Sequence, residues 1–149
     1  MEDRQITEHF RLSEFACKDG TWYPVEWIDS RLTPLCYMDE IIRDACGGHA
    51  VTILCGYRTL AYNDHLREKG LTGESGKTGV AEHSQHIEGM ANDIVVFGIP
   101  TMTLYKIVLD LYYGSKLPML GGIGLYQGHG FVHVDVHKSQ DGHLRKWVG

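Results

Sequence analysis

The chain has 149 residues, 43% of them hydrophobic and 22% charged, which is typical of one compact globular domain. Its formal net charge is −5 and its 14 Lys and Arg form no cluster, which argues against a nucleic-acid-binding protein. No stretch approaches the roughly 18 consecutive apolar residues of a membrane span, and the polar N-terminus lacks the apolar segment of a signal peptide.

The first half of the chain predicts mainly helices. In chain order, the expected elements are a short helix over residues 10–17, a longer helix over 34–46, a strand over 51–55 and a helix over 60–69. Ser13 is the expected N-cap of the short helix. Thr33 can cap the longer helix and Pro34 suits its first turn, and apolar residues recur along it at steps of three and four. The strand is predicted by its β-branched and apolar side chains.

The second half predicts strands around one helix. Residues 70–82 are rich in Gly, Ser and Thr and predict a long polar loop, which we expect to form one wall of a substrate cleft. The pattern then predicts strands over residues 91–97, 121–126 and 131–136 and a helix over 101–113. Because helices come first and strands cluster late, we expect one small α+β domain over residues 1–149, with a central antiparallel sheet packed by helices.

The last predicted strand carries polar groups on one face. By alternation, His133, Asp135 and His137 share a face, and the valines between them form the opposite, core face. A single polar residue there would indicate plain solvent exposure. Three of them beside a Gly-rich turn indicate a functional site.

The four cysteines of the chain form no C-x-x-C pair, so we expect them to be free thiols, although a disulfide between two of them stays open.

A second polar cluster lies over residues 82–93. His86 and Asp93 flank a tight segment with two small residues, and a turn there would bring His86 beside Asp93 in the following strand. With His133, they supply two imidazoles and one carboxylate, the protein ligand set of a catalytic zinc that keeps one position for water. The same ligand types form the facial triad of non-haem Fe(II) enzymes, and His133 and Asp135 have a spacing common there, so iron is the alternative metal.

The motifs around these residues resemble the D,D-carboxypeptidase family of zinc peptidases. Ser84-Gln-His86-Ile-Glu-Gly-Met-Ala-Asn-Asp93 matches the family signature S-x-H-x-x-G-x-A-x-D, and His133-Val-Asp135 resembles the segment that closes one branch of the family. Three further segments agree with the family in the same order along the chain, and they cover residues 9–15, 55–59 and 121–126. The first of these resembles the opening of many phage-associated members.

The resemblance implies a zinc peptidase with an α+β fold shared by hedgehog signalling domains. It implies one Zn²⁺ per chain, held by His86, Asp93 and His133, and a peptidoglycan peptide as substrate. We expect a monomer of the carboxypeptidase, endopeptidase or phage endolysin type, acting on the cell wall after release or as part of a virion. D-Ala–D-Ala, D-Ala–diaminopimelate and L-Ala–D-Glu bonds all stay open. The alternative is a zinc-stabilised binding module without turnover, such as a phage tail part.

Further residues receive roles around the metal. Arg58 is expected to bind a substrate carboxylate or carbonyl, because its planar fork suits such groups. Ser84 is expected to orient a ligand or the substrate. The general base stays open, since Gly130 stands where several branches of the family have Asp or Glu. Asp135 is either that base or a carboxylate that orients a metal ligand, and His129 in the adjacent turn is a further candidate.

Overall fold

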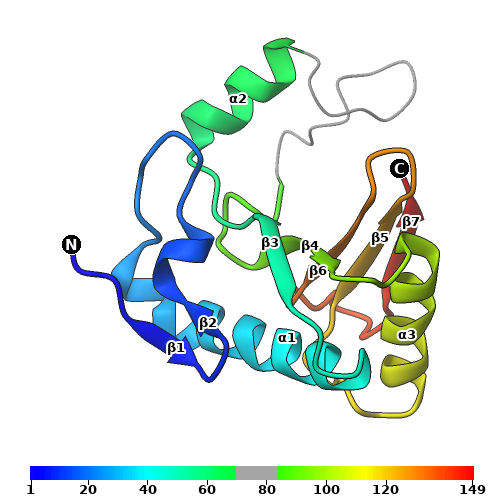
Figure 1. Cartoon of the computed structure of the whole chain (residues 1–149). Coiled ribbons are helices and arrows are strands. Elements are labelled where there is room, and N and C mark those ends of the chain that lie inside the picture. Colours follow the sequence, from blue (N-terminus) through cyan, green and yellow to red (C-terminus); the bar gives the residue numbers. More distant parts are fainter. Residues whose placement is uncertain (70–83) are drawn as a thin grey trace.

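The computed structural model describes residues 1–69 and 84–149 (Figure 1). Its elements are, in chain order, β1 (Gln5–Thr7), β2 (Phe10–Arg11), the 3-10 helices η1 (Leu12–Phe15) and η2 (Val25–Trp27), the π-helix η3 (Ile28–Leu32), α1 (Thr33–Ala45), β3 (Val51–Cys55), α2 (Leu60–Lys69), β4 (Ala91–Val96), α3 (Thr101–Tyr113), β5 (Gly122–Tyr126), β6 (Phe131–Asp135) and β7 (Arg145–Val148). The loop expected over residues 70–82 to form a cleft wall lies outside the described residues.

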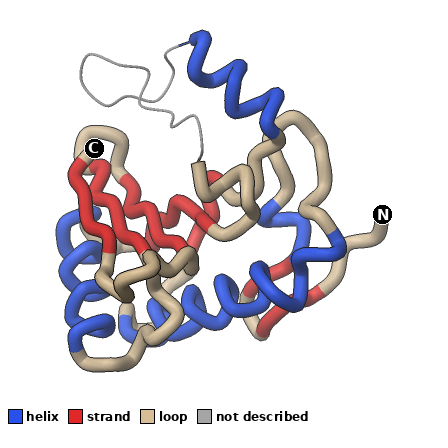
Figure 2. The backbone as a smooth tube through the Cα atoms, turned by 180° about the vertical axis from the view of Figure 1, so that it is seen from behind, coloured by secondary structure: helices blue, strands red, loops and turns tan. Residues whose placement is uncertain are grey.

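A five-stranded sheet forms the centre of the molecule, in the order β3-β4-β6-β5-β7. The first three pairings are antiparallel, as predicted, whereas β7 joins β5 in parallel, which makes the sheet mixed. Helix α1 runs below the sheet and α3 runs beside it in both views (Figures 1 and 2). The small α+β domain predicted from the sequence is therefore confirmed.

The hydrophobic core lies between one face of the sheet and the helices α1 and α3. Val132 and Val134 of β6 and Ile94 of β4 are fully buried in it, together with apolar residues of both helices. The alternation predicted for β6 is thus correct on its valine face. The opposite face of the same strands is free to carry polar groups, and this is where the candidate site is found.

Residues 10–17 do not form the predicted helix capped by Ser13. They begin with β2, which pairs with β1, and continue as the single 3-10 turn η1. The Ser13 hydroxyl donates to the Asp3 carboxylate (2.8 Å), and the Glu14 carboxylate accepts the backbone N–H of Arg11 (2.6 Å). The N-terminal segment therefore engages the Ser13 side chain, whereas Glu14 caps the start of η1 through the Arg11 N–H.

Helix α1 has nearly the predicted bounds, but Thr33 does not cap it. The preceding residue, Leu32, already has helical dihedral angles (φ −70°, ψ −44°), because the π-helix η3 runs into α1 without a break. A helix that continues a preceding helical segment has no free N-terminal N–H groups to cap. Pro34 lies in the first turn, as predicted. Helices α2 and α3 have the predicted bounds.

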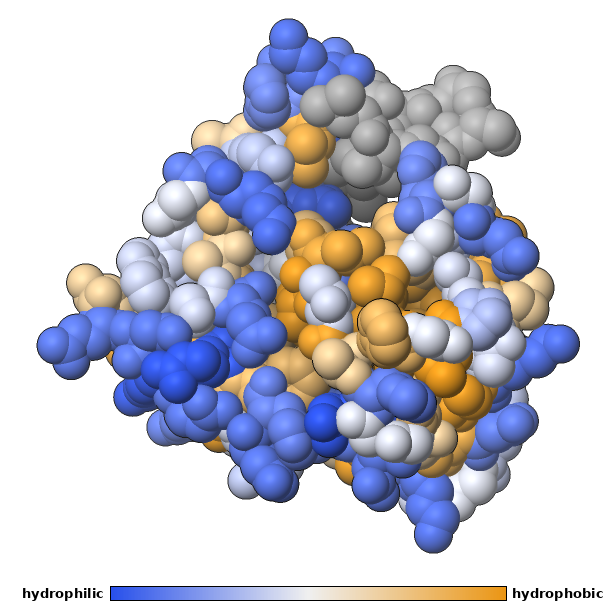
Figure 3. All heavy atoms as spheres, viewed as in Figure 1, coloured by the Kyte–Doolittle hydropathy of each residue, from blue (hydrophilic) through white to orange (hydrophobic). Residues whose placement is uncertain are grey.

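The surface combines a hydrophobic region with hydrophilic margins. In the space-filling view, hydrophobic side chains gather at the centre and right of the face seen in Figure 1, and hydrophilic ones surround them (Figure 3). Leu54 of the edge strand β3 and Phe97 after β4 are among the large hydrophobic residues left exposed. Within residues 1–69 and 84–149, no helix combines the length and apolar character needed to cross a bilayer.

Candidate metal centre

One row of residues crosses the polar face of the whole sheet. Each residue of the row is paired directly with the next one on the neighbouring strand. The row consists of Cys55 (β3), Asp93 (β4), His133 (β6), Gly124 (β5) and Trp147 (β7). A register shift in β3 just before Cys55 brings this thiol onto the polar face. Directly paired residues of neighbouring strands have side chains about 5 Å apart, so a row of this kind brings ionisable groups into contact.

His86 reaches this row from a tight turn before β4. Its backbone N–H is 3.2 Å from the Ser84 hydroxyl oxygen, and its carbonyl accepts the N–H of Gly89 (3.2 Å). Gly89 has a φ of 65°, and the Tyr23 hydroxyl donates to its carbonyl (2.6 Å). A Cβ at Gly89 would lie 2.8 Å from that hydroxyl, so both the turn and the packing of Tyr23 require glycine. The predicted turn is confirmed.

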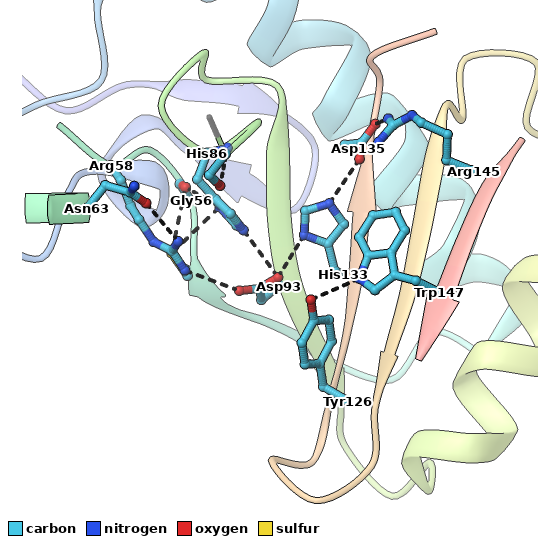
Figure 4. Close-up of polar contacts among 12 residues, drawn as sticks. Gly56, Arg58, Asn63, His86, Asp93, Tyr126, His133, Asp135, Arg145 and Trp147 are labelled. Atoms are coloured by element: carbon cyan, nitrogen blue, oxygen red, sulfur yellow. Dashed lines mark hydrogen bonds and ion pairs between the residues drawn. The ribbon is translucent and has the colours of Figure 1, made fainter. Parts of the chain in front are cut away.

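His86, Asp93 and His133 converge on one point (Figure 4). The His86 Nε2 lies 3.3 Å from the Asp93 Oδ1, and the His133 Nδ1 lies 3.2 Å from the same oxygen. The two imidazole rings are 5.1 Å apart between centroids. All three residues are buried, with exposed fractions of 3%, 5% and 7%. The structure therefore brings together the three residues predicted from the sequence as metal ligands.

The other ring nitrogens identify the tautomers of the two histidines. The His86 Nδ1 lies 2.7 Å from the Gly56 carbonyl oxygen, which only accepts, so this nitrogen carries the proton. The His133 Nε2 lies 2.9 Å from the Asp135 Oδ2 and carries its proton in the same way. In the neutral rings, both nitrogens that face Asp93 therefore present lone pairs. Three electron-pair donors that meet in a buried place fit a metal cation, and zinc favours this mixture of nitrogen and carboxylate oxygen.

The electrostatics of the cluster agree with a bound cation. Burial lowers the pKa of His86, but the charges of Cys55 and Asp93 outweigh it and raise the pKa to about 10. Burial also lowers the pKa of His133, while hydrogen bonds to Asp135 and Asp93 raise it overall. For Asp93, burial raises the pKa and the charges and hydrogen bonds of the two histidines lower it overall, below its ordinary value. The site thus favours positive charge beside the Asp93 carboxylate.

Cys55 is a neighbour of the site that the sequence interpretation missed. All four cysteines are free thiols, as expected, but the Cys55 Sγ lies 3.6 Å from the His86 Nδ1 and accepts the Arg58 Nε–H at 3.3 Å. Ligand atoms of Cys55, His86 and Asp93 also lie within 4.8 Å of one another, which makes a second possible donor set. Burial raises the pKa of the Cys55 thiol, but the charge of His86 lowers it overall. Its position directly before the Gly56-Tyr-Arg58 motif was the available signal.

Arg58 lies beside the cluster, as the sequence interpretation anticipated. It is buried, with an exposed fraction of 8%, and its Nη2 lies 3.9 Å from the Asp93 Oδ2. Its Nη1–H donates to the Asn63 Oδ1 (3.2 Å), and its backbone N–H donates to the His86 carbonyl (3.0 Å). Ser84 is buried as well and contacts the backbone of His86, so both residues support the turn that carries this histidine.

The two candidates for the general base lie in different surroundings. Asp135 is fully buried, and its Oδ2 contacts the His133 Nε2 while its Oδ1 accepts the Arg145 Nη2–H (2.6 Å). His129 is exposed in the turn between β5 and β6, and its ring lies 6.3 Å from that of Phe131. The structure thus joins Asp135 to the ligand cluster, whereas the described contacts of His129 are with Tyr126 and Phe131, at the end of β5 and the start of β6. His137 lies exposed beyond β6.

Comparisons with known proteins agree with this site. A family model described as peptidoglycan L,D-endopeptidase MepK matches residues 9–147. The probable peptidoglycan L,D-endopeptidase MepK of Haemophilus influenzae is 30% identical over 99 residues, which cover 66% of this chain and 43% of that protein. The peptidoglycan L,D-endopeptidase MepK of Escherichia coli K12 is 31% identical over 97 residues, covering 65% and 43%. That of Shigella flexneri has the same identity and coverage.

The chain spans less than half the length of these curated relatives, and no solved structure matches it. The printed names specify an L,D-endopeptidase of peptidoglycan. They support neither the carboxypeptidase nor the phage endolysin that the sequence interpretation also allowed.

Proposed function

The chain belongs to the peptidoglycan L,D-endopeptidase MepK family, and on this premise we propose that it is a zinc-dependent peptidase that hydrolyses a peptide bond in peptidoglycan. The observation that carries the proposal is the meeting of the His86 Nε2 and the His133 Nδ1 at one buried oxygen of Asp93. A chain of this family with three such donors has the ligand set of a catalytic zinc. The names of the relatives favour a bond of the L,D type.

In this proposal His86, Asp93 and His133 hold one zinc ion, which supplies Lewis-acid polarisation of a carbonyl and activation of a water molecule. The Gly56 carbonyl and Asp135 accept hydrogen bonds from the His86 Nδ1–H and the His133 Nε2–H, which turns the other nitrogen of each ring towards the metal. Metal binding would take both imidazoles in their neutral form. Asp93 adds the single negative charge of the ligand set. Exclusion of water by the surrounding burial strengthens the electrostatic interactions within the site.

Arg58 is proposed to bind a carboxylate or carbonyl oxygen of the substrate. A buried guanidinium is costly unless it is paired, and its distance of 3.9 Å from Asp93 is too long for a hydrogen bond. Substrate oxygen atoms are suited to complete its hydrogen bonds, and the planar fork favours a bidentate partner. Ser84 is proposed to act indirectly, by holding the turn that presents His86.

The two candidates for the general base, Asp135 and His129, receive different roles in this proposal. Asp135 is proposed to orient His133, because it is fully buried and both of its oxygen atoms are engaged. His129 is then the remaining candidate for the general base, and its exposed imidazole is able to exchange protons with substrate and solvent. The finer setting, a phage or prophage lysin, rests only on the resemblance of residues 9–15 to phage-associated members.

The test is a digest of purified peptidoglycan by the full chain, with mass spectrometry of the released peptides. The zinc-loaded protein should release peptides, and the variant His86→Ala should release none. Products from both proteins would remove His86 from the mechanism. If neither releases peptides while the unmodified protein binds zinc and sediments with the wall, a binding module without turnover becomes the better account. Metal analysis of the protein as isolated separates zinc from iron.

A further inference from the structure

Two side chains of the strand β7, those of Arg145 and Trp147, extend over the neighbouring strand β5 towards the metal centre. In the parallel pairing of β5 and β7, Gly122 is paired with Arg145 and Gly124 is paired with Trp147. A Cβ at Gly122 would collide with the Arg145 guanidinium, and a Cβ at Gly124 would collide with the Trp147 indole. The two glycines of β5 therefore leave the space through which residues of β7 reach β6, two strands away.

Arg145 uses this space to reach the carboxylate behind His133. Its Nη2–H donates to the Asp135 Oδ1 (2.6 Å) and to the His137 carbonyl (2.9 Å). The other oxygen of Asp135 contacts the His133 Nε2 at 2.9 Å. Asp135 has no exposed surface, so these partners offset the cost of burying its carboxyl group. Arg145, Asp135 and His133 thus form one chain of charge-assisted hydrogen bonds that ends at the imidazole.

Trp147 uses the same space to reach the ring of His133 directly. The two ring centroids lie 5.0 Å apart, with an angle of 52° between the planes. The Trp147 Nε1–H donates to the Tyr126 hydroxyl (2.8 Å), which fixes the indole on the other side (Figure 4). His133 is therefore held at its Nε2 by Asp135 and on its ring by Trp147. Both restraints leave the Nδ1 directed at Asp93.

We propose that Arg145 and Trp147 are positioning residues, which fix the tautomer and the orientation of the His133 imidazole. Arg145 acts through Asp135 and Trp147 acts by direct ring contact. The inference rests on the proposed metal site, in which His133 is a ligand. Residues that hold a metal-binding histidine in this way typically change metal affinity by about 10- to 100-fold when they are lost.

The first test measures zinc affinity of the full chain by competition with a chelator. Arg145→Met should bind zinc about 10- to 100-fold more weakly than the unmodified protein. Arg145→Lys, which keeps a positive charge near Asp135, should recover most of the loss. Arg11→Met is the matched control, because it removes another Arg–Asp pair (2.8 Å), which joins Arg11 of β2 to Asp3 in the N-terminal segment. This control should bind zinc as tightly as the unmodified protein.

Thermal unfolding of the metal-free variants shows whether Arg145 positions His133 or only stabilises the fold. The proposal expects weaker zinc binding by Arg145→Met at an unfolding temperature close to that of Arg11→Met. Unchanged zinc affinity of Arg145→Met would overturn it. Trp147→Leu should weaken zinc binding and Trp147→Phe should not, since Phe keeps a ring against His133; equal affinities of these two variants would contradict the role of Trp147.

A second measurement uses the unmodified protein, so it can be made even if a variant fails to fold. Nitrogen NMR of the zinc-loaded, histidine-labelled protein should show His133 bound to metal through Nδ1, with a protected proton on Nε2. Metal bound through Nε2 would overturn the inference. The outcome is independent of turnover, because a protein that binds zinc without cleaving peptidoglycan still reports on His133. A protein that binds no zinc overturns this inference and the proposed metal site together.

Discussion

At the scale of single residues, the choice of nitrogen on one imidazole decides which atoms hold the metal. His86 has Asp93 on its Nε2 side, whereas Gly56 and Cys55 lie on its Nδ1 side. The Gly56 carbonyl is nearer to Nδ1 (2.7 Å) than the Cys55 Sγ is (3.6 Å), so the proton stays on Nδ1. A ring with this tautomer binds metal through Nε2. This favours the ligand set with His133 over the set with Cys55.

The two ligand sets are separated by a pair of substitutions. Cys55→Ser should keep zinc at the level of the unmodified protein, because the thiol lies on the protonated side of His86. His133→Ala should lose zinc, because it removes one of three protein ligands. Metal analysis after purification, with circular dichroism as the control for folding, checks both. Zinc lost from Cys55→Ser and kept by His133→Ala would reverse the assignment.

Arg58 provides a second prediction for a single residue. Arg58→Lys should keep zinc but lower kcat/KM by about 10-fold or more, because a charge-assisted hydrogen bond contributes about 1.5–3 kcal/mol and a lysine cannot reproduce the bidentate fork. Arg67→Lys, on the surface of α2, is the matched control and should have no effect. Steady-state kinetics on a soluble muropeptide check this. Equal kinetics of the two variants would return Arg58 to a purely structural role.

At the scale of elements, a buried polar pair joins α1 to β4 behind the site. Asp39 is fully buried in α1 and accepts a hydrogen bond from the side-chain amide of Asn92, the neighbour of Asp93. The Asp39 Oδ1 and the Asn92 Oδ1 have no hydrogen-bond partner within the described part of the chain. Burial raises the pKa of Asp39 well above its ordinary value of 3.8, and the hydrogen bond from Asn92 opposes this only in part. The folded protein therefore holds the Asp39 proton to a higher pH than the unfolded chain does.

This pair makes stability depend on pH. Because the folded state keeps the Asp39 proton and the unfolded state releases it above about pH 4, the contribution of this group to stability falls as pH rises from there. Asp39→Asn should be less sensitive, and its amide can pair with both side-chain groups of Asn92. Urea unfolding at pH 5 and pH 8 checks this, with Asp44→Asn on the exposed side of α1 as the control. A pH dependence unchanged by Asp39→Asn would contradict it.

The strand β5 supplies the other prediction at this scale. Gly124→Ala should destabilise the fold by about 1–3 kcal/mol, because its Cβ would meet the Trp147 indole and the Tyr126 ring. Gly128→Ala is the control, since a Cβ there meets nothing within 4 Å. Denaturant unfolding of both variants checks the difference. Equal stability of the two would show that β7 is not packed against β5 as described.

The sequence predicts the elements whose signals are local. Helices α2 and α3 follow from apolar spacing and glycine, and β3, β4 and β6 follow from β-branched runs. The strand β7 has no such signal, because it is short and pairs in parallel with a strand about 20 residues earlier. The roles of Arg145 and Trp147 were missed for the same reason, since they depend on that pairing. The ligand set was predictable from motifs, but the tautomers depend on Gly56 and Asp135, which only the fold brings near.

At the scale of the whole molecule, one face of the central sheet forms the hydrophobic core and the other face carries the candidate site. Its valine face packs on α1 and α3, and its other face carries the row from Cys55 to Trp147. Residues of the site come from the strands β3 to β7 and from the turn before β4, so the site exists only in the folded molecule. Zinc that binds this site should therefore stabilise the fold. The unfolding temperature should fall when zinc is removed with a chelator and recover when zinc is restored.

The most direct test of the central claim uses two purified muropeptide dimers, one with an L,D cross-link and one with a D,D cross-link. Each is incubated with the zinc-loaded protein, with the metal-free protein and with protein to which zinc has been restored, and the masses of the products are measured. The account predicts that only the two zinc-containing samples act, and that they split the L,D dimer. Cleavage of either dimer by the metal-free protein, or no cleavage of the L,D dimer with zinc bound, would contradict it.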